Sequence, residues 1–186
     1  MLCSAIAGSA SARNLSQNEQ RFRTTYSPLS FIPSFGSTIR CPLTLEGSLH
    51  SRTIAKVAGS LIGYVNRVVF GTCEAGRLRA NTETLPWHVT YESFSGTLPL
   101  ITSLGKSIHN MSFEIDGEIF GLAVRCRYNM PSERFTTTRE ARGVLTGETP
   151  GSETVNSSTE GCPSYRLSGT GSVKTPTGAN IVVTLI

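Results

Sequence analysis

The chain has 186 residues, of which 38% are hydrophobic and 16% are charged, and its formal net charge is +4. This length suits one ordinary domain with a buried core. The sequence contains no apolar run long enough for a membrane-spanning helix, no internal repeat and no heptad pattern, which excludes transmembrane-helix, solenoid and coiled-coil classes. The basic residues are scattered and do not form the dense stripe with interleaved aromatic residues that is typical of nucleic-acid binding, so we expect no nucleic-acid partner.

The first twelve residues, MLCSAIAGSASA, carry no charge and end in Ala10-Ser11-Ala12 before Arg13. Signal peptidase accepts only small side chains before the cut, so this ending predicts the remnant of a secretory signal over residues 1–12, although its basic start is missing. The alternative is a disordered tail of small residues. We therefore expect a secreted, extracellular protein.

The cysteine pattern predicts disulfides. Of five cysteines, Cys3 would leave with the signal, and Cys41, Cys73, Cys126 and Cys162 would remain. An even number in an exported chain predicts two bridges, and the absence of a Cys-x-x-Cys pair argues against a zinc ribbon or a redox site. Three pairings are possible. We favour Cys41 with Cys73 and Cys126 with Cys162, because each pair closes a local loop.

The first half of the chain alternates between polar stretches and strand patterns. Residues 13–37 are rich in Ser, Asn and Gln, and we interpret them as a flexible lead-in. Strict alternation predicts a strand at 39–49. Residues 53–58 are interpreted as a short helix or irregular turn, followed by a strand at 61–70, because glycines disfavour a longer helix. Alternation at 85–91 predicts a further strand with the only tryptophan facing inward.

The strongest local signal is Asp116-Gly117, which lies between two alternating runs. Because this dipeptide adopts positive φ at low cost, it predicts a two-residue hairpin turn in which Phe113 faces Phe120. The apolar face of this hairpin would continue through Cys126 and Tyr128.

Residues 131–164 have few large apolar side chains and are interpreted as a long exposed loop. After it we expect two strands, at 165–169 and 179–186, that pair with each other, with a turn at 175–178. Because short alternating runs recur and no strong helix competes, the predicted fold is all-β. We expect an antiparallel β-sandwich or jelly-roll-like domain of about eight strands over 38–186, with at most one short helix.

Five short segments of the central chain carry a resemblance to a known family. They are Cys41-Pro-Leu-Thr-Leu, Thr53-Ile-Ala-Lys, Gly59-Ser-Leu-Ile-Gly-Tyr, Leu85-Pro-Trp-His-Val and Gly96-Thr-Leu-Pro. In these segments the chain resembles a family of small secreted actinobacterial proteins that is uncharacterised. The resemblance covers about residues 39–128 and the C-terminal strands. It implies export and a β-rich body, and it implies no functional residue.

One group of polar residues is our candidate binding surface. His88, Thr90 and Glu92 follow one another on the polar side of a predicted strand. His88 could act as a general base, but four residues along a strand span roughly 13 Å, which is too far for a direct hydrogen bond to Glu92. A surface histidine is the plainer interpretation. The long loop at 131–164 is a second candidate binding region.

We therefore expect a secreted structural or binding module, non-enzymatic and without cofactor or metal. Its partner would be an unknown protein, a glycan or a component of the cell envelope. The first alternative is a secreted hydrolase that uses a His/carboxylate pair, although no Gly-x-Ser-x-Gly elbow or phosphate-binding loop occurs. The second alternative is a self-assembling surface or coat subunit, which would expose large apolar patches.

Overall fold

The computed structural model describes residues 14–97, 100–119, 122–140 and 144–185, so the predicted signal remnant lies outside the described residues. Within them the chain is all-β, with antiparallel strand pairs and one 3-10 turn, η1 (Thr82–Thr84). The strands are β1 (Asn14–Gln17), β2 (Arg21–Pro33), β3 (Ile39–Leu49), β4 (Thr53–Ala55), β5 (Leu61–Phe70), β6 (Arg77–Ala80), β7 (Trp87–Thr97), β8 (Leu100–Ile119), β9 (Leu122–Arg139), β10 (Leu145–Pro150), β11 (Thr154–Val155), β12 (Tyr165–Ser168), β13 (Gly171–Lys174) and β14 (Val183–Leu185). The predicted fold class is confirmed.

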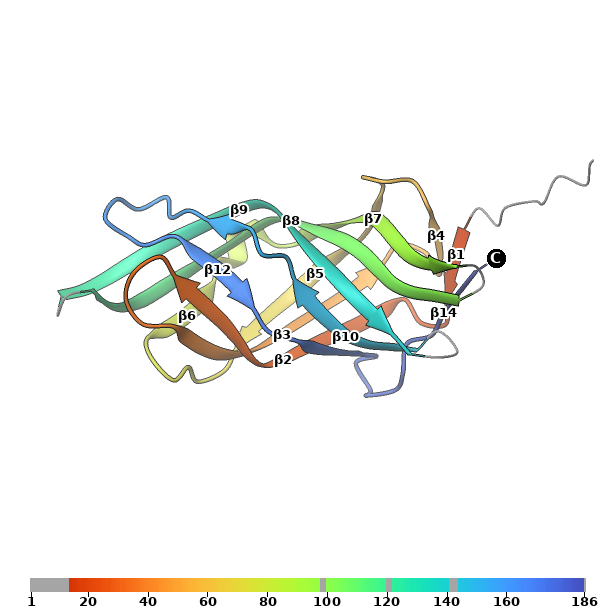
Figure 1. Cartoon of the computed structure of the whole chain (residues 1–186), viewed down its shortest axis with the longest axis horizontal. Helices are drawn as coiled ribbons and strands as arrows, with labels where there is room; N and C mark the ends of the chain where they lie inside the picture. The colour runs from red at the N-terminus through yellow and green to blue at the C-terminus, as the bar shows by residue number, and fades with distance from the viewer. Residues whose placement is uncertain (1–13, 98–99, 120–121, 141–143, 186) are drawn as a thin grey trace, which may run out of the picture.

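The main sheet closes on itself. Its neighbouring strands follow the order β2, β13, β10, β9, β8, β7, β5 and β3, and β3 pairs again with β2. Among the described residues, eight strands therefore form the ring. A separate sheet of β14, β1 and β4 lies at one end, and the paired strands β8 and β9 extend to the other (Figure 1).

Opposite walls of the closed sheet pack on one core. Phe31 on β2 contacts Phe113 on β8 with ring centroids 5.3 Å apart, although β2 and β8 are not neighbours in the sheet. Facing walls are the sandwich-like feature that the sequence predicted; the pairing of β2 with β3, which joins the walls, was not predicted. Two interior cavities measure only about 40 and 30 Å³, so side chains fill the inside.

Three strand predictions are confirmed. β3 and β5 have the predicted bounds, 39–49 and 61–70, and β7 begins at the buried Trp87 directly after Pro86. In β3 the odd positions are buried and most even positions reach solvent, as two-sided alternation requires.

The β8–β9 hairpin is confirmed, but its turn does not lie at Asp116-Gly117. Phe113 pairs with Tyr128 rather than with Phe120, because β8 continues to Ile119. The turn residues lie outside the described residues. The longer hairpin stacks the rings of Phe113 and Tyr128 at 5.3 Å. Since the register moves by an even number of residues, Tyr128 and Cys126 still face the core.

The flexible lead-in expected at 13–37 is wrong for the residues that the structure describes. β1 and β2 lie in this segment, and β2 pairs with β3 along one edge and with β12 and β13 along the other. A register shift between Tyr26 and Leu29 moves the buried positions from even to odd numbers. The shift breaks the alternation on which the strand prediction depends.

The long loop expected at 131–164 is also largely wrong. β9 runs to Arg139, and β10 and β11 lie inside the range. The inward side chains of this part include Glu133, Thr137 and Glu148, all buried. A strand that faces a polar interior carries no apolar alternation, so its sequence resembles a loop.

Two smaller expectations differ from the structure. Residues 53–55 form β4, which pairs with β1, instead of a helical turn. The C-terminal strands do not pair with each other, because β12 pairs with β2 and β14 pairs with β1. The turn at 175–178 is confirmed by a hydrogen bond of 2.9 Å from the Gly178 N–H to the Thr175 carbonyl.

The interior contains a buried ion pair. Lys106 Nζ on β8 lies 2.5 Å from Glu148 Oε2 on β10, and Glu148 is fully buried. Glu148 also accepts hydrogen bonds from the Tyr26 hydroxyl at 3.1 Å and the Thr137 hydroxyl at 3.3 Å. The Lys106 ammonium lies 4.9 Å from the centre of the Phe22 ring. β2, β8, β9 and β10 thus meet at one carboxylate, which offsets the cost of burying it.

A second interior carboxyl has no such partner. Glu133 is 1% exposed, and its Oε1 atom has no hydrogen-bond partner. Burial, with a smaller contribution from the Glu153 carboxylate, raises the pKa of Glu133 from 4.5 to about 7. The folded state therefore favours the protonated acid.

Glu133 predicts a pH dependence of stability. Its favourable contribution is complete below the unfolded pKa of 4.5 and is lost as the pH rises through the folded pKa of about 7. We expect the free energy of unfolding to fall by about 3 kcal/mol between about pH 5 and about pH 8. Glu133→Gln should remove this fall, as measured by urea denaturation across the range. An equal fall in the variant would assign the pH dependence to other groups.

Candidate functional site

A cavity of about 410 Å³ lies at the end of the molecule that carries the β8–β9 hairpin. This volume is in the range of small-molecule sites and is about ten times that of either interior cavity. Four separate parts of the chain line it: the β8–β9 arm, the β2–β3 connection, the β5–β6 connection and the start of β12. Their lining side chains are Ile115, Glu118, Val124, Cys126, Phe35, Ser37, Ile39, Ala75, Pro163 and Tyr165.

The first disulfide fastens one wall of this cavity. Cys73 lies in the β5–β6 connection, two residues before Ala75, and is bonded to Cys41 on β3. The Glu74 N–H donates to the Arg40 carbonyl at 2.9 Å, and the Gly71 N–H donates to the Pro42 carbonyl at 2.8 Å. The connection is therefore held to β3 on both sides of the bridge.

The second disulfide fastens another wall. Cys126 on β9 is bonded to Cys162, which directly precedes the lining residue Pro163. The Tyr128 hydroxyl donates to the Pro163 carbonyl at 2.8 Å, and the Ser34 N–H donates to the Ser164 carbonyl at 2.8 Å. Both predicted cysteine pairs are thus confirmed, and each holds a connection that borders the same cavity.

Gly76 lies where the β5–β6 connection meets the β8–β9 arm, and this position requires a glycine. It has a φ of +68°, and a Cβ atom there would lie 2.8 Å from the Asp116 carbonyl oxygen on β8. A larger residue would therefore be strained and would push the β5–β6 connection away from the β8–β9 arm. The glycine keeps this side of the cavity closed.

The lining of this cavity combines apolar side chains with a smaller polar part. Ile115, Cys126 and Tyr165 are buried, and Phe35 is exposed at the border. The Glu118 carboxylate and the hydroxyls of Ser37 and Tyr165 supply the polar side-chain groups. A lining with more apolar than polar surface suits binding of a small molecule through an apolar group, and it contains no histidine that could act as a base.

A second hollow, of about 460 Å³, lies on the outer wall near Asn110 and Pro131. Only β8, β9 and the η1 residue Thr84 line it, and no disulfide borders it. The cavity at the hairpin end has four converging parts and two covalent fastenings. We therefore regard the cavity at the hairpin end as the candidate site.

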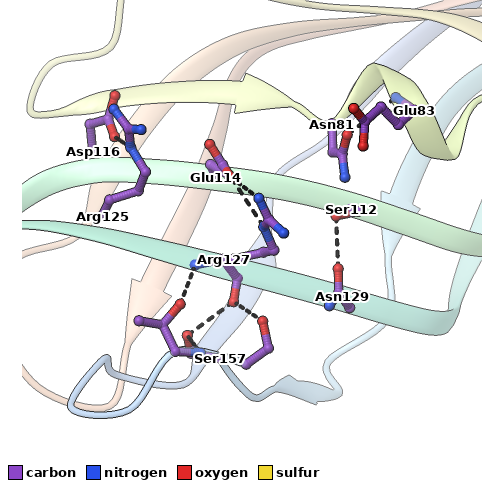
Figure 2. Close-up of polar contacts among 11 residues, drawn as sticks. Asn81, Glu83, Ser112, Glu114, Asp116, Arg125, Arg127, Asn129 and Ser157 are labelled. Atoms are coloured by element: carbon purple, nitrogen blue, oxygen red, sulfur yellow. Dashed lines mark hydrogen bonds and ion pairs between the residues drawn. The ribbon is translucent and has the colours of Figure 1, made fainter.

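The outer face of the β8–β9 arm beside this cavity is a ladder of paired polar groups (Figure 2). Arg125 Nε lies 2.6 Å from Asp116 Oδ1, and Arg127 Nη2 lies 2.6 Å from Glu114 Oε1. The hydrogen bond with Arg125 lowers the pKa of Asp116. Because each charge on these rungs has a partner across the strand pair, this face stabilises the arm and offers little charge to a ligand.

The predicted group of His88, Thr90 and Glu92 is only partly brought together. The Thr90 hydroxyl donates to Glu92 Oε1 at 3.0 Å, because a bulge at Glu92 interrupts the alternation of β7. His88 instead packs against the Tyr64 ring, with ring centroids 5.2 Å apart. Thr90 also lies 2.8 Å from His109 Nε2, a contact that the sequence did not predict.

The Glu92–Thr90–His109 arrangement differs from a catalytic triad. In a triad the histidine lies between the nucleophile and the carboxylate, so that it can take the proton of the nucleophile. Here the Thr90 hydroxyl lies in the middle. Its one hydrogen is directed to Glu92, which leaves His109 without a carboxylate partner to orient it. Among the described residues, no group of three or more His, Cys, Asp or Glu side chains is arranged to hold a metal ion.

The cavity residues were not predicted from the sequence. Phe35 lies in the segment interpreted as a flexible lead-in, and Pro163 in the segment interpreted as a loop. One signal could have found them: Cys73 and Cys162 both lie in polar connections rather than in strands. A disulfide that joins a connection to a strand holds the connection in one position, which is what the wall of a binding site requires.

Fold and cavity together define a disulfide-bonded domain with a closed antiparallel sheet and a ligand-sized cavity at one end. No protein-family model, curated protein or solved structure matches the chain. The resemblance to small secreted actinobacterial proteins therefore stays a prediction. In the part of the chain that the structure describes, no helix is long and apolar enough to cross a membrane.

Proposed function

We propose that this protein is a secreted, non-enzymatic binding module whose ligand occupies the cavity at the hairpin end. One observation carries the proposal: both disulfides fasten connections that border this cavity, whereas the two interior cavities between described residues measure only about 40 and 30 Å³. Rigid walls reduce the entropy lost when a ligand binds, so fastening is most useful at a binding site.

Export is supported by the same bridges. Disulfides form and persist in oxidising compartments outside the cytoplasm. The small uncharged residues before Arg13 support a secretory signal. The hydrolase and the coat subunit remain predictions without an observation in their favour.

The ligand class is a small apolar molecule, or an apolar group of a larger partner. Ile39, Ile115, Val124 and the ring of Tyr165 supply the apolar lining. Burying such a group contributes roughly 25 cal/mol per Å² of apolar area removed from water.

Filling the cavity should abolish binding. Ala75 lies in the lining and is exposed, so Ala75→Trp would place an indole in the cavity without disturbing the core. We expect the neutral fluorescent probe N-phenylnaphthylamine to bind saturably to the protein. The variant should bind it at least about tenfold more weakly, a loss of about 1.4 kcal/mol. Fluorescence titration measures both affinities.

The matched control is Ala55→Trp, an exposed position on β4 in the sheet at the opposite end of the molecule. This variant should bind the probe as the unchanged protein does. Equal weakening in both variants, or no saturable binding by the unchanged protein, would contradict the proposal.

A further inference from the structure

The three histidines of the chain gather on one outer face of the closed sheet. His88 on β7 and His109 on β8 are directly opposite each other in the strand register, and Tyr64 on β5 is opposite His88. His50, directly after β3, packs edge-on against the Tyr64 ring with centroids 4.7 Å apart. We name these four residues together with Thr90 the histidine face.

This face lies outside the cavity that we propose as the ligand site. His50 and His88 are exposed, and Tyr64 and His109 are half-buried. None of the four lines the cavity at the hairpin end. An inference about the histidine face is therefore independent of the proposed function.

The surrounding charges favour an anion. Arg134 on β9 is paired in register with Ser107, which is itself opposite Thr90. Near His50, Arg21 and Arg52 lie close enough to Glu19 to lower its pKa, after the larger effect of a backbone hydrogen bond from Arg21. Glu92 is half-buried and accepts from Thr90, and Glu46, two residues before Ser48 on β3, is paired with Arg23 and Arg67. Among these groups, five arginines stand against three carboxylates before any histidine is protonated.

Acidification adds charge at this face. Imidazole is the side chain whose ordinary titration falls between pH 5 and 8. In the imidazolium form, His109 Nε2–H donates to the Thr90 hydroxyl, and this hydroxyl donates to Glu92 Oε1. These two hydrogen bonds are compatible with each other. Two imidazolium groups opposite each other on neighbouring strands repel, and an anionic group between them relieves the repulsion.

The geometry points to an anionic glycan, and we propose that the histidine face binds a polysaccharide with carboxylate or sulfate groups more tightly as the pH falls. Neighbouring strands lie about 4.8 Å apart, so Tyr64, His88 and His109 form a row with nearly the repeat of one pyranose unit in an extended chain. The exposed edges of the His50 and His88 rings provide donors for sugar oxygens beside the charges.

The test measures binding of a heparin oligosaccharide by isothermal titration calorimetry. We expect the affinity to be about tenfold higher at about pH 5.5 than at about pH 7.5, because added positive charges strengthen binding to a polyanion. His50→Asn together with His88→Asn should remove most of this difference. Both side chains are exposed and contact only the Tyr64 ring in the interactions described, so the fold should tolerate the change.

Three comparisons make the test decisive. Arg166→Gln, which removes an exposed charge on β12, should keep the pH dependence, and Ala75→Trp should leave heparin binding unchanged. Uncharged dextran should not bind. An affinity that does not change with pH, or that keeps its pH dependence in the double histidine variant, would overturn the proposal. Polyglutamate that binds as tightly as heparin would overturn the glycan assignment. Because this readout does not involve the cavity probe, it can fail while the proposed function stands.

Discussion

Lys106→Met is expected to lower the free energy of unfolding by about 4 kcal/mol, because it leaves the Glu148 carboxylate charged and enclosed without a counter-charge. The carboxylate would keep only the hydrogen bonds from Tyr26 and Thr137. Methionine has nearly the shape of the lysine stem, so lost packing contributes little. Urea denaturation at neutral pH measures the loss.

Removal of both partners separates charge from packing. In Lys106→Met with Glu148→Leu no buried charge remains, and we expect at least about 2 kcal/mol to be recovered. The Tyr26 hydroxyl would then lack its acceptor, which keeps recovery incomplete. Lys174→Met, at a surface lysine that contacts Asn180, should change stability by under about 0.5 kcal/mol. A similarly small loss for Lys106→Met would show that the pair is not needed.

Removal of the Cys126–Cys162 bridge should cost about as much. With a sequence separation of 36, the chain-entropy model assigns a stabilisation of about 4 kcal/mol. Cys126→Ser with Cys162→Ser should lose this stability in urea denaturation. Since Pro163 follows Cys162 directly, the variant should also bind the cavity probe more weakly at a temperature where it remains folded.

The other bridge provides the comparison. Cys41 and Cys73 are separated by 32 residues, so Cys41→Ser with Cys73→Ser should lose a similar amount, about 4 kcal/mol. It should weaken probe binding through the Ala75 wall. If either serine variant lost stability and kept the full affinity for the probe, that bridge would not shape the site.

Strands with one apolar face were predictable. In 39–49 and 61–70 the predicted bounds agree with β3 and β5, and Trp87 faces inward as expected. β3 packs against the apolar part of the core with burial that follows its alternation, and β5 was predicted from its β-branched residues and glycines. β2 and the part of β9 after residue 130 were missed for the opposite reason. A register shift interrupts β2, and β9 directs Glu133 and Thr137 into the interior.

The candidate site was not predictable to the same degree. Thr90 and Glu92 were named because alternation places both on the polar side of a predicted strand, and their side chains do form a hydrogen bond. His109 joins them from the neighbouring strand, across a pairing register that no local pattern specifies. The cavity depends still more on distant residues, because Phe35 and Pro163 meet only when the sheet closes.

The sequence by itself determined the all-β class and the inward faces of several strands, since alternation is a local property; it favoured the observed cysteine pairs among three possible pairings, because each closes a local loop. Only the tertiary structure decided that β2 pairs with β3 and closes the sheet, that the interior holds Lys106 and Glu148, and that four parts of the chain enclose one cavity. Each of these depends on residues far apart in the chain, whose pairing lowers the free energy only after the whole sheet has formed.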